Sequence, residues 1–157
     1  MTKLLSILLI LLPTISNAQI AADNSISLST PTPLVFSYSS VDELLAPKVL
    51  HNAIEIKLSP KRYSRNIMAY VTFTGPLQNA VPADWLTMNL AGKTSVNAVI
   101  YKAQNQLSTV PVALFTQPPS PTNEDLTFYY DIMLSPLNTF VNTGSYNFNI
   151  IISITQS

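Results

Sequence analysis

The sequence has 157 residues, and its eight basic and eight acidic side chains give a formal net charge of zero at neutral pH. A chain with so few and so balanced charges lacks the basic surface that binding to nucleic acid or to anionic lipid requires. It contains no cysteine, so disulfide bonds cannot stabilise it and a cysteine-ligated zinc site is excluded. The length suits a single domain.

The first residues are typical of a secretory signal peptide. Lys3 gives a positive start, residues 4–12 form an apolar run, and small residues lead up to a cleavage site after Ala18. The apolar run is too short to span a bilayer, which takes about 20 residues. We therefore expect a signal peptide over residues 1–18 and one mature domain over residues 19–157. The domain is expected in the periplasm or at the cell surface, with no integral membrane segment after cleavage.

Alternation of apolar and polar residues with a period of two predicts strands throughout the mature region. The predicted strands cover residues 19–29 (with the alternation continuing over 34–38), 53–58, 66–74, 85–90, 95–103, 110–115, 126–134 and 146–155. About eight strands without an amphipathic helix between them favour an all-β fold. The predicted form is an antiparallel immunoglobulin-like Greek-key sandwich of about 7–9 strands, without the Cys–Trp–Cys signature of true immunoglobulin domains.

Some segments carry additional signals. Residues 66–74 have apolar side chains on both faces, which predicts a central position in a sheet. Pro111 lacks an amide hydrogen, so its strand is expected to lie at an edge or to start late. Residues 91–93 are predicted to form a turn. Ser40 followed by Glu43 fits a helix capping box, although a proline soon afterwards limits the helix to about one turn.

The sequence contains no arrangement of residues that indicates catalysis. His51 is the only histidine, and Glu55, four residues on, does not reliably share its face on a strand. The acidic pair at 42–43 fits a helix start, and the pair at 124–125 fits a solvated loop. There is no G-x-S-x-G elbow, and three scattered glycines form no phosphate-binding loop. We therefore expect a protein that is not an enzyme, with no catalytic residue, cofactor or metal site.

Four basic residues lie close together within residues 57–65, and this basic cluster is a candidate ligand surface. Arg62 and Arg65 flank Tyr63 within it, and such a cluster forms either a solvated turn or a contact to an anionic glycan or protein partner. Trp85 and the tyrosines could stack on a sugar, although strand aromatics more often pack in a core. Tyr63, Arg62, Arg65 and Trp85 are therefore the candidate ligand residues of an alternative function, a monomeric carbohydrate-binding module.

The last predicted strand is uncharged and free of proline. Its alternate residues are large and apolar, which indicates one buried face: Tyr146, Phe148, Ile150, Ile152 and Ile154. We expect it to be an interior strand of the sandwich, or an acceptor strand that a neighbour covers. The strand beside it is then either residues 19–28 of the same chain or the same segment of another copy.

The end of the sequence resembles secreted pilin-like sandwiches of the spore-coat-U and archaic chaperone–usher pilin type, and related bacterial surface domains. The resemblance rests on Gly144-Ser145-Tyr146-Asn147-Phe148 running into IIISITQ, on the stretch 128–134 and on the signal peptide. It implies a non-catalytic, secreted structural or adhesive surface protein, a pilus or filament subunit among the options. Its partners would be other copies or related subunits.

The same resemblance implies assembly by β-strand addition through the N-terminal segment, in which backbone hydrogen bonds give affinity and alternate side chains give specificity. The residues with the alternation that a donated strand needs are Ile20, Ala22, Ile26 and Leu28. The other reading of this segment, which stays open, is the first strand of a complete monomeric sandwich. Many spore-coat-U domains contain disulfides, and this chain departs from that pattern.

Overall fold

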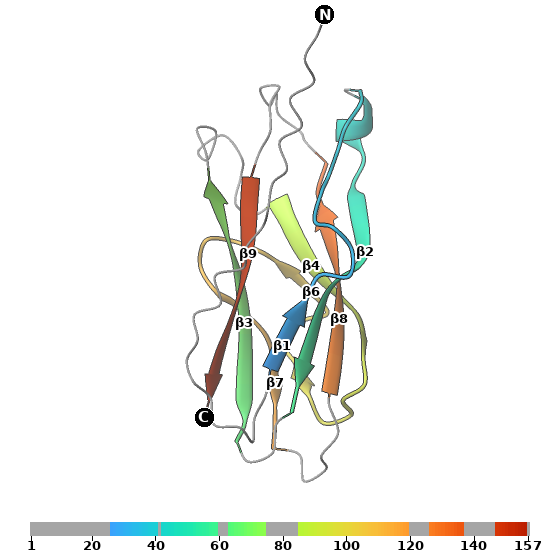
Figure 1. Cartoon of the computed structure of the whole chain (residues 1–157). Coiled ribbons are helices and arrows are strands. Elements are labelled where there is room, and N and C mark those ends of the chain that lie inside the picture. The colour runs from blue at the N-terminus through green and yellow to red at the C-terminus, as the bar shows by residue number, and fades with distance from the viewer. Residues whose placement is uncertain are drawn as a thin grey trace, which may run out of the picture.

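The computed structural model describes residues 26–40, 42–59, 63–74, 85–119, 126–136 and 147–156. Over these ranges the chain forms nine strands and one short 3-10 turn, arranged as two facing antiparallel sheets (Figure 1). The all-β sandwich predicted from the sequence is confirmed. In the same ranges no helix has the length and apolar character needed to cross a membrane.

Each sheet has a simple order of strands. Sheet A has five strands in the order β1 (Ile26–Ser29), β2 (Lys48–Leu58), β8 (Leu126–Leu134), β4 (Leu86–Lys93) and β6 (Gln104–Gln106). Sheet B has four strands in the order β5 (Val99–Ile100), β7 (Val112–Gln117), β3 (Arg65–Thr74) and β9 (Asn147–Gln156). The 3-10 turn η1 (Asp42–Leu45) precedes β2.

The core lies between the two sheets and follows the predicted alternation. On β8, every second side chain is inaccessible to solvent, beginning with Phe128 and including Tyr130 and Ile132. The ring of Phe128 stacks on that of Phe115 from β7, with centroids 3.9 Å apart and planes inclined by 18°. This stack joins sheet A to sheet B at the centre of the sandwich. The predicted central position of β3 is also confirmed, since it lies between β7 and β9.

β2 begins earlier than predicted because a bulge interrupts its alternation. The pairing of β2 with β8 shifts register between Leu50 and Ile54, and Asn52 within the bulge has a positive φ of 48°. The carboxylate of Asp131 on β8 accepts a hydrogen bond from the Asn52 amide at 2.8 Å, which holds this left-handed conformation. Asparagine tolerates that region better than most residues.

The region after β4 differs most from the sequence prediction. Residues 91–93 form the end of β4 rather than a turn, and a register shift between Leu90 and Gly92 accommodates them. The single strand predicted over 95–103 is wrong, because these residues turn and then form only β5. The hydroxyl of Ser95 accepts a hydrogen bond from the Ala98 amide at 3.2 Å and so stabilises the turn.

The late start predicted for the strand around Pro111 is confirmed, since β7 begins at Val112. The alternative expectation of an edge strand does not hold, because β7 lies between β5 and β3.

Residues 30–40 connect the two sheet A strands β1 and β2 in an extended path. Leu34, Phe36 and Tyr38 pack against the core with partial burial, so their predicted alternation is present. Phe36 lies near Phe148 of β9, with ring centroids 6.4 Å apart. The segment belongs to neither sheet ladder, so its alternation reflects packing of a connecting segment on the core and not a strand.

An ionic latch closes this connection at η1. The carboxylate of Glu43 accepts hydrogen bonds from Lys48 Nζ at 2.8 Å and from the Ser39 hydroxyl at 2.5 Å. Lys48 also donates to the carbonyl of Ser37 and lies 4.2 Å from the centre of the Tyr38 ring. The predicted cap is present in part, since the Glu43 amide donates to Ser40 Oγ at 3.4 Å.

The latch should open in acid. The hydrogen bonds from Lys48 and then Ser39 lower the pKa of Glu43 from 4.5 to about 2. A lowered pKa stabilises the latch above pH 4.5, and this contribution disappears as the pH falls from 4.5 to about 2. We expect the protection of the Ser39 amide, its exchange rate relative to an unstructured amide at the same pH, to be lost in that window in the wild type and to be low at every pH in Glu43→Gln. Asp42→Asn is the control and should follow the wild type; equal pH profiles in all three proteins would contradict the prediction.

Candidate functional site

The long edge strand β9 is the most distinctive surface of the fold. It pairs with β3 along its whole length, from Arg65 opposite Gln156 to Thr74 opposite Asn147. Its other side has no strand partner among the described residues. Among the described residues β9 is therefore an edge strand, not the interior strand expected. The described part of the expected neighbour 19–28 does not lie beside it, because β1 pairs with β2 in sheet A.

The composition of β9 leaves this edge unprotected. Its inward side chains, Phe148, Ile150, Ile152 and Ile154, pack against the core. All of its side chains from 148 to 154 are only half buried on either face. Tyr146, the remaining residue of the predicted acceptor strand, lies outside the described residues.

Edge strands usually carry charges, proline or bulges that prevent pairing with other chains. β9 contains no charged residue and no proline, and its pairing with β3 has no register shift.

The other three sheet edges are much shorter. β1 has four residues, β6 has three and β5 has two, and short edges offer little backbone for pairing. β9 has ten. Within the described part of the chain, β9 is thus the one edge long enough to accept a full additional strand.

The topology shows what kind of strand would fit there. In an immunoglobulin-type sandwich, one sheet has the order A–B–E–D and the other contains C–F–G. Here β1, β2, β8 and β4 follow the first order, and β3 and β9 occupy the positions of C and F. No described strand occupies position G, which is the free side of β9.

The predicted donor residues divide into two groups. Ile20 and Ala22 lie outside the described residues. Ile26 and Leu28 are part of β1, where they pair with Leu58 and Ile56 of the same chain. Ile26 packs against the core, whereas Leu28 is 49% exposed, so β1 is held by few contacts.

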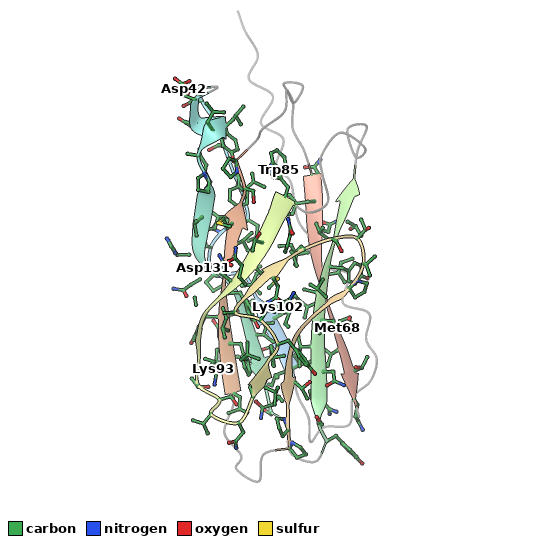
Figure 2. All side chains as sticks on the ribbon, turned by 180° about the vertical axis from the view of Figure 1, so that it is seen from behind. Asp42, Met68, Trp85, Lys93, Lys102 and Asp131 are labelled. Atoms are coloured by element: carbon green, nitrogen blue, oxygen red, sulfur yellow. The ribbon has the colours of Figure 1, made fainter. Side chains whose placement is uncertain are left out.

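The candidate ligand residues do not form one surface. Arg65 and Tyr63 are neighbours, with Cζ of the arginine 5.9 Å from the ring centre. Arg62 lies outside the described residues. Trp85 and Lys93 are at opposite ends of β4 (Figure 2), roughly 26 Å apart at the usual rise per residue. Arg65 lies at the Lys93 end, because the residue paired with it, Gln117, accepts a hydrogen bond from Ser95.

The tyrosines also face different ways. Tyr130 is fully buried in the core. Tyr129 adjoins it on β8 and so faces the outside of sheet A, whereas Tyr70 lies between buried neighbours on β3 and faces the outside of sheet B. These aromatic rings therefore do not gather into the exposed platform that sugar stacking requires.

His51 has a structural setting that the sequence did not reveal. Its Nδ1 lies 3.0 Å from the carboxylate of Asp131, which also holds the bulge at Asn52. The carbonyl of His51 accepts a hydrogen bond from the Thr32 hydroxyl at 3.2 Å. Glu55 pairs with Lys57 instead, at 2.7 Å. In the described ranges no group of three or more histidine, aspartate or glutamate residues could hold a metal ion.

No protein-family model matches this sequence, and no curated protein or solved structure was found to be significantly similar to it.

Proposed function

We propose that the protein is a non-catalytic, secreted structural or adhesive surface protein whose copies assemble by β-strand addition. The observation that carries the proposal is the uncharged ten-residue edge of β9, which no strand of the described part of the chain covers. Burying that edge satisfies backbone groups of β9 that have no described strand partner and covers half-exposed apolar side chains. The occupant takes position G of the sandwich.

The N-terminal segment of a second copy is the proposed occupant. Residues 19–28 alternate in the way that a strand against a half-buried face needs, and they carry a single charge, that of Asp23. The part of this segment that pairs in its own chain, β1, is short and mostly exposed. Exchange of so small a strand costs each copy little, whereas the added strand gains a long ladder on β9.

A charge on the outer face of β9 should prevent assembly without damaging the core. Ser153 lies on the side of β9 that faces away from the sandwich, opposite Met68 of the central strand β3. We expect the wild-type mature protein to form oligomers or fibres in sedimentation and negative-stain microscopy, and Ser153→Lys to remain a folded monomer. Met68→Lys is the matched control, since it adds the same charge to the same face away from the edge, and it should still assemble.

Removing residues 19–25 tests the donor. This deletion leaves β1 intact, so the shortened protein should fold but should not assemble by itself. A synthetic peptide of residues 19–28 should bind it and should not bind Ser153→Lys. A wild-type protein that stays monomeric at high concentration, or a peptide that binds both variants equally, would contradict the proposal.

A further inference from the structure

A buried arginine without a described partner lies at one end of the sandwich. Arg65 is the first residue of β3, and its side chain shares the inward face with Ile67 and Ala69. The residue is only 4% exposed, and neither Nη1 nor Nη2 has a hydrogen-bond partner among the described residues. In Figure 1 the start of β3 lies with the ends of β7 and β9 at the same end of the molecule.

The neighbouring side chains that the structure describes do not neutralise the guanidinium. Gln117, across from Arg65 on β7, already accepts a hydrogen bond from Ser95 at 2.6 Å and donates one to the Pro118 carbonyl at 2.9 Å. Gln156, across on β9, is exposed and uncharged. Tyr63 presents a neutral ring 5.9 Å from Cζ.

The buried guanidinium of Arg65 favours the binding of an anion. Arginine stays protonated in proteins, so burial cannot be relieved by loss of the charge. An unpaired buried charge strongly disfavours the folded state, and a partner that makes hydrogen bonds to both Nη atoms removes that penalty. The planar fork of a guanidinium matches the two oxygens of a carboxylate.

We propose that Arg65 is the centre of a carboxylate-binding site at this end of the sandwich. Tyr63, which is 45% exposed and has its ring centre 5.9 Å from Cζ of Arg65, lies beside the site on its solvent side. The side-chain amide of Gln156 lies on the same face of the sheet and can donate a further hydrogen bond to the bound group. The carboxylate is either a small molecule or an aspartate or glutamate side chain of a second copy. The site is independent of strand addition.

The test uses sodium acetate as the probe, with sodium chloride at equal ionic strength as the reference. Acetate is expected to shift the Nε–Hε signal of Arg65 in a saturable way and to raise the unfolding temperature of the mature protein. Arg65→Met should be at least as stable as the wild type in chloride, because it removes an unpaired buried charge, and should lose the response to acetate completely. Arg65→Lys should keep a weakened response.

Two further arms identify the source of the carboxylate. A full response at low protein concentration shows that a free carboxylate is sufficient. An unfolding temperature in chloride that rises with protein concentration in the wild type, but not in Arg65→Met, assigns the group to a second copy. The proposal is overturned if acetate has no effect and Arg65→Met is strongly destabilised in chloride. Glu124→Gln or Asp125→Asn, two positions outside the described residues, would then reproduce that loss and identify a partner within the chain.

Discussion

Replacing Phe128 with alanine is expected to lower the free energy of unfolding by about 3–5 kcal/mol. The Phe128 side chain is fully buried and stacks on Phe115 across the gap between the sheets, at 3.9 Å between ring centres. Alanine loses both the burial of the apolar ring and its contacts with neighbouring side chains. The strands on both sides are rigid and prevent the resulting cavity from closing. Urea unfolding followed by the fluorescence of the single tryptophan would measure the loss.

Met133→Ala is the control for Phe128→Ala. Met133 is on the same strand, with its side chain on the outer face of sheet A and half exposed. Its loss is expected to cost roughly 1 kcal/mol. Equal losses in the two variants would show that the stacked rings are not the link between the sheets.

Replacing Tyr130 with phenylalanine is expected to stabilise the protein by about 1–3 kcal/mol, the desolvation cost of an unpaired buried hydroxyl. The residue is fully buried, and its hydroxyl has no hydrogen-bond partner within the described ranges. Phenylalanine keeps the ring and removes only that oxygen. Tyr129→Phe, one residue earlier and on the outer face, should change stability by less than about 0.5 kcal/mol.

The same hydroxyl should make the protein sensitive to alkali. Burial raises the pKa of Tyr130 well above its ordinary value of 10.0. The unfolded chain releases this proton above pH 10 while the folded chain keeps it, so stability falls as the pH rises, by up to about 1.4 kcal/mol per pH unit. Tyr130→Phe should lack this part of the decline. Parallel stability curves for the two proteins above pH 10 would contradict the assignment.

The sequence predicts this fold well wherever alternation is uninterrupted. Strand 126–134 is found with its predicted bounds, since each inward residue is apolar. The sequence prediction missed the first part of β2 because Asn52 adopts a left-handed conformation that interrupts the alternation. Asp131, which is distant in sequence, stabilises that conformation by a hydrogen bond. The prediction of a strand over 95–103 was wrong for a similar reason. The hydrogen bond between Ser95 and Gln117, which are distant in sequence, stabilises the turn that begins at Ser95.

The candidate site could be predicted only in part. The alternation of Phe148 and the isoleucines after it predicted the apolar face of β9. The position of β9 at an edge depends on which strands pair with each other, and alternation within one strand carries no information about this pairing. Arg65 stood out as part of a basic cluster, a feature usually exposed to solvent. Its burial follows from its place on the inward face of β3, in line with Ile67.

The position of β9 also governs when the domain can fold. β3 is the central strand of sheet B, and its pairing with β9 joins residues 65–74 to residues 147–156. Loops of that length make pairing slow, because many residues must lose freedom before the first contact forms. During synthesis the side of β3 that pairs with β9 therefore has no partner in the sheet until residues 147–156 have been made. In that interval the unpaired side of β3 is exposed to pairing with other chains, so the order of synthesis makes this strand prone to aggregation.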